Sequence, residues 1–195
     1  MQTLGLSSET KRSDGRLKSI FWPTVESAWD VNYLGQQGFW ICTAIGIFQL
    51  IGTTMLGTTL FVALGLVAFL IFFLGGMGVR EASWPAAALV FAIYLSGIVD
   101  AFSKGHPPGV LAIIGVGILL SNVRAAFLAS EWRPATEGED RPTRFNESFS
   151  DKLVDQLPAK VWPVLKVPFF ILASLYLMLI LAAFAVDIVN CFGAV

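Results

Sequence analysis

The chain has 195 residues, of which 55% are hydrophobic and 14% are charged, and its mean hydropathy is +0.71. Soluble domains carry about a quarter charged residues, so this composition argues against a soluble domain and indicates a chain surrounded mostly by lipid. The formal net charge of −1 argues against the basic surface typical of proteins that bind nucleic acid.

Residues 1–33 are expected to be a polar N-terminal segment that ends in an amphipathic helix on the membrane surface. Residues 1–20 lack the apolar core and the cleavage site of a signal peptide, so we expect the N-terminus to stay on the side of synthesis. Within IFWPTVESAWDVNYL, residues 20–34, Pro23 suits a first helical turn. Apolar residues follow at helical spacing: Phe21, Trp22, Val25, Ala28 and Trp29.

Residues 34–132 are expected to form four membrane-spanning helices. Residues 34–78 carry no charge and are about twice as long as one span of ~20 residues, so the chain must turn once within them. The Gly and Thr cluster IGTTMLGTT marks that turn and places helices at 35–53 and 56–77. Helices at 83–102 and 109–132 are separated by SKGHPPG, where Pro107 and Pro108 end any helix.

Residues 133–160 are predicted to be a cytoplasmic loop that contains a short amphipathic helix. In FSDKLVDQLP the apolar residues Phe149, Leu153, Val154 and Leu157 share one helical face. A fifth spanning helix is expected at 162–189, within the final segment 161–195. The predicted fold class is therefore all-α, an integral membrane helical bundle with five transmembrane helices.

Lysine and arginine predict the orientation, because cytoplasmic loops carry an excess of both. Of the 13 Lys and Arg residues, only Lys104 falls on the side opposite the N-terminus in this topology. All six tryptophans fall near the inner interface, the level that Trp prefers. We therefore expect the N-terminus in the cytoplasm and the C-terminus outside. The count of five spans depends on segment lengths, since an even number would weaken the charge asymmetry little.

Arg124 stands within the apolar stretch of the fourth helix, about four residues or ~6 Å inside its inner end. An arginine side chain can reach the headgroups over that distance, although helical side chains lean towards the helix N-terminus, which here points to the bilayer centre. We expect an anchor at the headgroup level, or a pair with Glu81 or Glu131. The alternative is a charge held in the membrane for function.

Small residues recur at every fourth position on two consecutive helices. The fourth helix carries Gly117, Ser121, Ala125 and Ala129. The third carries Ala88, Ala92 and Ser96, and Asp100 continues the row. Such rows let helix backbones approach in lipid, so we expect the two rows to face each other.

Polar residues in and near the spans give few candidates for chemistry. Asp100, Lys104, His106 and Asp187 could gather at the outer face to bind a cation or relay a proton, or they could simply solvate helix ends. Gln49, beside Gly46 and Thr53, and also Asn122, are expected to form hydrogen bonds with neighbouring helices.

Cysteine and histidine are too few for a Cys/His metal site. The chain has Cys42, Cys191 and His106, and such a site needs three or four ligands; a carboxylate-based site stays open. Cys42 and Cys191 are predicted at opposite ends of their spans, too far apart for a disulfide. We assign no catalytic, cofactor-binding or metal-binding residue, since no nucleophile elbow, P-loop or HExxH pattern is present.

Three short motifs within residues 20–130 are the basis for a resemblance to other proteins: FWPT at residues 21–24, QGFW at 37–40 and NVRAAFLAS at 122–130. This region resembles a loose group of small uncharacterised multi-pass proteins of the bacterial inner membrane. The resemblance implies membrane residence and no activity. We expect an accessory, scaffold or assembly subunit without catalysis, or alternatively a transporter or channel subunit that acts as an oligomer. Membrane lipids, further copies of the chain or other membrane proteins are its expected partners, and nucleic acid is not.

Overall fold

The computed structural model describes residue 18 and residues 21–25, 28–131 and 149–193, and it is helical with no strand in these residues. The main helices are α2 (Ala28–Thr54), α3 (Thr59–Arg80), α4 (Trp84–Ser103), α5 (Val110–Glu131) and α7 (Leu157–Gly193). The short helix α6 (Phe149–Asp151) and a π-helical turn, η1 (Lys152–Gln156), lead directly into α7.

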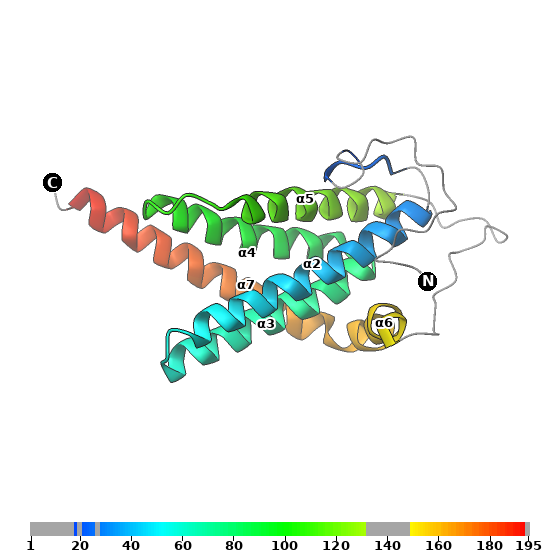
Figure 1. Ribbon diagram of the computed structural model, residues 1–195, viewed down its shortest axis with the longest axis horizontal. Helices are drawn as coiled ribbons and strands as arrows, with labels where there is room; N and C mark the ends of the chain where they lie inside the picture. Colours follow the sequence, from blue (N-terminus) through cyan, green and yellow to red (C-terminus); the bar gives the residue numbers. More distant parts are fainter. Residues whose placement is uncertain (1–17, 19–20, 26–27, 132–148, 194–195) are drawn as a thin grey trace.

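Five helices of the described chain are long and apolar enough to cross a membrane, which confirms the predicted all-α fold class and a multi-pass membrane protein. The turns between α2 and α3 and between α4 and α5 lie at one end of the molecule, where α7 also finishes (Figure 1). We call it the turn end. The opposite end carries the α3–α4 connection, the last turn of α5 and α6, and we call it the Arg80 end.

Helix boundaries at the two hairpin turns lie within three residues of the prediction, because turn residues fix them, whereas α2 begins at Ala28 and not at the predicted residue 35. The α2–α3 turn falls within IGTTMLGTT, and Thr58 caps α3 by accepting a hydrogen bond from the Phe61 N–H. The α4–α5 turn falls within SKGHPPG, where Gly105 takes a left-handed φ of 80°. The predicted loop 133–160 lies outside the described residues up to residue 148.

The predicted amphipathic helix over residues 20–34 is wrong for residues 23–25, which are not helical. Pro23 does not start a helix, and α2 begins at Ala28 instead. Pro23 is buried, and its carbonyl oxygen accepts a hydrogen bond from Arg124. This tertiary contact holds the segment against α5 in a conformation that helical periodicity does not predict.

Glycines in α3 allow close packing on both sides of that helix. A Cβ added at Gly76 would lie 3.0 Å from Cβ of Cys42 on α2, and one at Gly75 would lie 2.2 Å from Val90 on α4. The core forms around this contact from buried residues of four helices: Phe39, Ile71, Phe72, Val90 and Phe169 among others. Close backbone approach of this kind is the main source of helix packing in lipid.

Trp162 is buried in this core, at 8% exposure, and packs against Phe169 and Gly78. The glycine opposite it makes room for the indole, and the level of Trp162 at the inner interface stays a prediction. Trp22 and Trp84 keep nearly half of their surface exposed.

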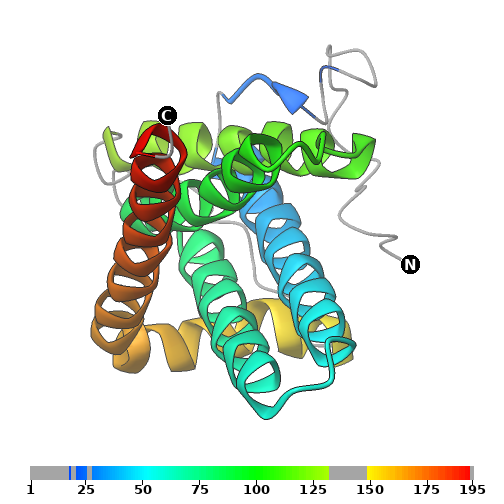
Figure 2. The same cartoon turned by 90° about the vertical axis from the view of Figure 1, so that its left-hand side faces the viewer.

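α7 changes direction in its first half, as Figure 2 shows end-on. Pro163 and Pro168 stand inside the helix there, and proline removes a helical hydrogen bond and bends a helix. The predicted amphipathic helix at 149–158 is present as α6, η1 and the start of α7. Val154 on its predicted face is buried, whereas Phe149 is 82% exposed.

Candidate functional site

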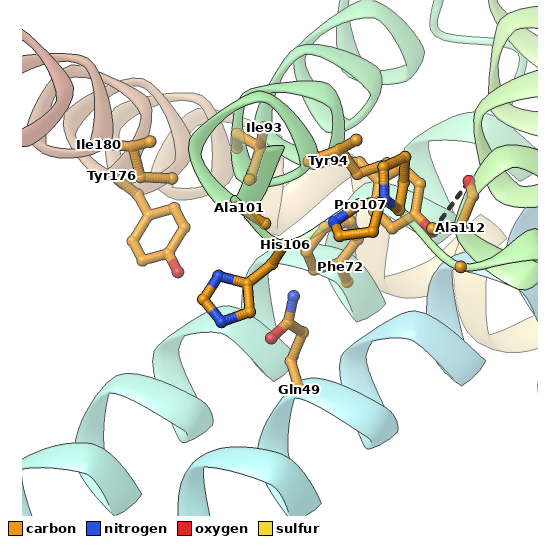
Figure 3. A pocket seen from close by; sticks show the side chains of 14 residues that line it. Gln49, Phe72, Ile93, Tyr94, Ala101, His106, Pro107, Ala112, Tyr176 and Ile180 are labelled. Carbon is orange, nitrogen blue, oxygen red and sulfur yellow. Dashed lines mark hydrogen bonds between the residues drawn. The ribbon is translucent and has the colours of Figure 1, made fainter. Parts of the chain in front are cut away.

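A cavity of about 390 Å³ lies towards the turn end, between the α2–α3 and α4–α5 hairpins (Figure 3). Its walls come from α2, α3, α4, α5, α7 and the α4–α5 turn. The lining residues are Gln49, Phe72, Ile93, Tyr94, Gly97, Ile98, Ala101, His106, Pro107, Pro108, Gly109, Ala112, Tyr176 and Ile180. No Lys, Arg, Asp or Glu is among them.

Polar groups from three separate elements line this cavity. Gln49 comes from α2, His106 from the α4–α5 turn and Tyr176 from α7, and Figure 3 shows the three beside the same space. They have no hydrogen-bond partner among the described residues. The hydroxyl of Tyr94 instead donates to the carbonyl oxygen of Ala112 at 3.4 Å.

Local backbone features place the cavity walls. The His106 N–H donates to Ala101 O at 3.0 Å, and the two prolines after it keep the turn from continuing as helix. Gly115 lets the Tyr94 ring approach α5, because an added Cβ would lie 2.6 Å from its hydroxyl oxygen. Gly97 leaves open space, since a Cβ added there would meet nothing within 4 Å.

The cavity ends on the hydrophobic core and does not continue to the Arg80 end. Phe72 and Ile93 line it and also belong to the buried core cluster. Of the polar residues that a continuous pathway would need, only Gln49 lines the cavity, and the others do not: Asp100, Asn122, Arg124 and Asp187. These residues therefore do not converge on one cavity in this chain.

The predicted gathering at the turn end is confirmed for Asp100, Lys104 and Asp187. Lys104 Nζ lies 2.9 Å from Asp100 Oδ1 and 3.3 Å from Asp187 Oδ2. His106 lines the cavity and is not part of these ion pairs. Hydrogen bonds to Asp100, and then to Asp187, raise the pKa of Lys104 above its ordinary value. Since about half of the lysine side chain is exposed, the cluster solvates helix ends and joins α4 to α7.

The expectation that the two small-residue rows face each other is wrong. Helices α4 and α5 are neighbours, but they meet through Tyr94 and Gly115. Ala92 and Gly117 each lie two positions from those contacts, about 200° around their helices. A Cβ at Gly117 would lie 2.8 Å from the Phe21 ring, so this residue of the α5 row faces the N-terminal segment.

The α4 row faces α7 instead. It lines an apolar groove of about 300 Å³ between the two helices. The groove is formed by Ala92, Leu95, Ser96, Val99, Leu177, Ile180, Leu181 and Phe184.

Arg124 has neither of the carboxylate partners that we expected. Its Nη1 donates to the carbonyl oxygen of Pro23 at 2.8 Å, and its guanidinium carbon lies 4.8 Å from the centroid of the Trp22 ring. Glu81 and Glu131 are not its partners within the described residues. Because Pro23 is not in a helix, its carbonyl oxygen is available to Arg124.

The hydrogen bonds expected between neighbouring helices from Gln49 and Asn122 are not formed among the described residues. Thr53 donates to the Gln49 carbonyl oxygen of its own helix at 2.8 Å. Asn122 is 2% exposed, and neither its amide oxygen nor its amide nitrogen has a partner. A Cβ added at Gly38 would lie 3.0 Å from that amide, which therefore packs directly against α2.

Sequence reasoning missed a buried ionic network at the Arg80 end. Arg80 Nε donates to Asp155 Oδ1 at 3.0 Å, and its Nη2 bonds the same oxygen. Its Nη1 donates to Asn32 Oδ1 at 2.7 Å. The Arg80 and Asp155 side chains are 3% and 4% exposed. The signal in the sequence was an arginine at the end of a span and Asp155 beside the apolar residues Leu153, Val154 and Leu157 of the predicted amphipathic helix.

Among the described residues, no group of three or more His, Cys, Asp or Glu side chains is placed to hold a metal ion. Cys42 is buried with a free thiol, and the side chain of Cys191 lies outside the described residues. Comparison with protein-family models, curated proteins and solved structures finds no match for this chain.

Proposed function

We propose that this protein is a non-catalytic accessory or assembly subunit of the bacterial inner membrane, which packs against a transmembrane helix of a partner protein. The α4–α7 groove carries this proposal. Its floor includes Ala92 and Ser96, small residues that allow a third helix to approach closely. The groove contains no charged residue, so its occupant is an apolar helix.

The exposure of α7 supports the same conclusion. Only 11% of its most apolar window is buried, against 39% for both α3 and α5. Large side chains along it, including Leu175, Met178 and Leu181, are at least half exposed. A helix with so little support from its own chain gains packing from a neighbour in the membrane.

Site-specific photocrosslinking in cells tests the proposal. A photoreactive amino acid at Ser96 should give one discrete protein adduct, whereas the same probe at Leu66, 47% exposed on α3, should label only lipid. Ala92→Phe fills the groove and should abolish the Ser96 adduct. Lipid labelling alone at Ser96 would contradict the proposal. An adduct with a second copy of this chain would show that the partner is the same protein, in a homo-oligomer.

The alternative, a transporter or channel subunit acting as an oligomer, has one feature in its favour. The turn-end cavity brings Gln49, His106 and Tyr176 together. In a single chain this cavity ends on Phe72 and Ile93, so a pathway would have to form between chains. Solute flux in proteoliposomes that carry the purified protein would favour this alternative.

The proposed orientation places the Arg80 end in the cytoplasm and the turn end outside. Lys104 is the one lysine or arginine that the predicted topology puts outside, and about half of its side chain is exposed. A membrane-impermeant amine reagent should therefore modify Lys104 in intact cells and leave Lys152 and Lys160 unmodified. Asp100→Asn should speed the reaction, because losing the carboxylate lowers the pKa of Lys104 and leaves more neutral amine. Protection of Lys104 in intact cells would reverse the orientation.

A further inference from the structure

The turn-end cavity combines apolar walls with a small set of polar side chains, as small-molecule sites in proteins do. Its volume, about 390 Å³, falls in the range of about 300–1,000 Å³ found for ligand pockets. It shares Ile180 with the α4–α7 groove, but its polar residues Gln49, His106 and Tyr176 do not line that groove, so a ligand here does not require the proposed partner helix.

The polar side chains in the cavity are uncommitted donors. The Gln49 amide, the His106 imidazole and the Tyr176 hydroxyl have no hydrogen-bond partner within the described part of the chain, and they come from three elements that enclose the same space (Figure 3). Tyr176 is partly buried, so its hydroxyl loses free energy there unless something pairs with it, whereas Gln49 and His106 are exposed residues that add further donors. A ligand with hydrogen-bond acceptors would pair with them.

The lining also indicates which charge a ligand of this cavity can carry. It contains no Lys, Arg, Asp or Glu, so a phosphate, carboxylate or ammonium group would find no permanently charged partner in this site. The deep wall is formed by Phe72 and Ile93, which belong to the core and suit an apolar or aromatic body. The occupant is therefore uncharged and lipid-soluble.

We infer that this cavity binds a neutral, lipid-soluble molecule through carbonyl oxygens that accept hydrogen bonds from Tyr176, His106 and Gln49. Two classes of membrane molecule carry that chemistry. One is the ring of an isoprenoid quinone, and the other is the ester region of an uncharged glycerolipid. Both place carbonyl oxygens beside an apolar body, so the experiment must separate them.

The test titrates the full-length protein in detergent with three probes and measures binding by native mass spectrometry. The probes are decylubiquinone, dioctanoylglycerol and dioctanoyl phosphatidic acid, which differs from the glycerolipid by its charge. We expect one or both neutral probes to bind and the phosphatidic acid to bind at least about tenfold more weakly. A preference between the neutral probes identifies the source of the carbonyl groups.

Two tyrosines in the same cavity provide matched variants. Tyr176→Phe removes an uncommitted donor and should weaken binding about fivefold, the effect of one net hydrogen bond. Tyr94→Phe removes a hydroxyl already bonded to Ala112 and should change affinity less than about twofold. Equal effects of the two variants would overturn the proposal, as would failure of both neutral probes or equal binding of the charged lipid.

A pair of glycine variants tests the location without risk to folding. Gly97→Phe extends into the open space of the cavity and should abolish binding, since a Cβ there meets nothing within 4 Å. Gly52→Phe is also unobstructed but lies outside the cavity, so it should bind like the unmodified chain. Binding that survives Gly97→Phe would show that the probe occupies another place and would overturn the assignment.

Discussion

Arg80 and Asp155 form a buried ion pair although 75 positions separate them in the sequence. Arg80 is the last residue of α3, and Asp155 lies in the π-helical turn before α7. The same guanidinium bonds Asn32 near the start of α2. One side chain therefore joins three segments at the Arg80 end.

Removing one partner of this pair should destabilise the protein strongly. Asp155→Leu leaves the Arg80 charge buried without a counter-charge, which costs about 3–5 kcal/mol. Arg80→Met with Asp155→Leu removes both charges, so the double variant should be more stable than Asp155→Leu alone. The free energy of unfolding, measured by denaturing detergent in mixed micelles, checks both expectations.

The exposed pair at the turn end is the control for this measurement. Lys104→Met breaks an ion pair of similar length with Asp100, but its side chains are in water and should contribute little. If the changes in the free energy of unfolding caused by the Arg80 and Asp155 substitutions simply add in the double variant, the two residues do not act as a pair.

Helical periodicity could not predict this pair, for a physical reason. A period of 3.6 residues assigns Leu153, Val154 and Leu157 to the buried face of residues 149–158. In the structure, the Leu157 N–H bonds Lys152 O, five residues back, so the turn contains an extra residue. The wider turn rotates Asp155 to the protein side, where it meets Arg80.

An added methyl group should have opposite effects on stability at two glycine positions. A Cβ at Gly78 would lie 2.6 Å from Cβ of Ala86 and 2.5 Å from Cη2 of Trp162, so Gly78→Ala should cost about 1–3 kcal/mol. Gly52→Ala meets nothing within 4 Å and should gain up to about 1 kcal/mol from helix propensity. The midpoint temperature of thermal unfolding in detergent should therefore fall for Gly78→Ala and rise for Gly52→Ala. A loss of stability in Gly52→Ala would contradict the open surroundings of that residue.

The number of spans and both turns of the two hairpins were predictable, because hydropathy and Gly, Pro and Thr clusters depend on local sequence. Which face of each helix contacts which neighbouring helix was not predictable in the same way. Alanine and glycine are so frequent here that several rows of small residues occur on each helix. Only the contact of Tyr94 with Gly115 decides which side of α4 meets α5, and that side excludes Ala92. The cavity also escaped prediction, because it needs Gln49, His106 and Tyr176 from three distant segments.

Asn122 is a position where an apolar residue should serve the fold as well as the native one. Its buried amide has no partner in the described structure, so it contributes a desolvation cost without a hydrogen bond. Asn122→Leu has a similar shape and should leave stability unchanged or raise it by about 1–3 kcal/mol, measured by unfolding in mixed micelles. Asn122→Asp should destabilise, because it adds a buried charge. A large loss in Asn122→Leu would reveal a bound water molecule or another partner at the α2–α5 contact.

Arg124 should hold the N-terminal segment on α5 by two separable contacts. Arg124→Lys keeps the charge and a donor for Pro23 O but loses the planar group that lies over Trp22, a contact worth about 0.5–1 kcal/mol at an exposed site. Arg124→Leu loses both contacts, including a hydrogen bond from a charged donor worth about 1.5–3 kcal/mol. The segment should therefore be released in part by the first change and more fully by the second.

Maleimide labelling of a cysteine at Val25 measures this release, with residue-level mass spectrometry to separate it from Cys42 and Cys191. The rate should rise from the parent to Arg124→Lys and rise again in Arg124→Leu, and Trp22→Ala should resemble the lysine variant because it removes the same stacking contact. A cysteine at Ser103, at the opposite end of the molecule, should react at one rate in all of these backgrounds. If the rate at position 25 is also constant, Arg124 does not hold the segment through Trp22 and Pro23. Its charge would then serve only to anchor α5 at the headgroups.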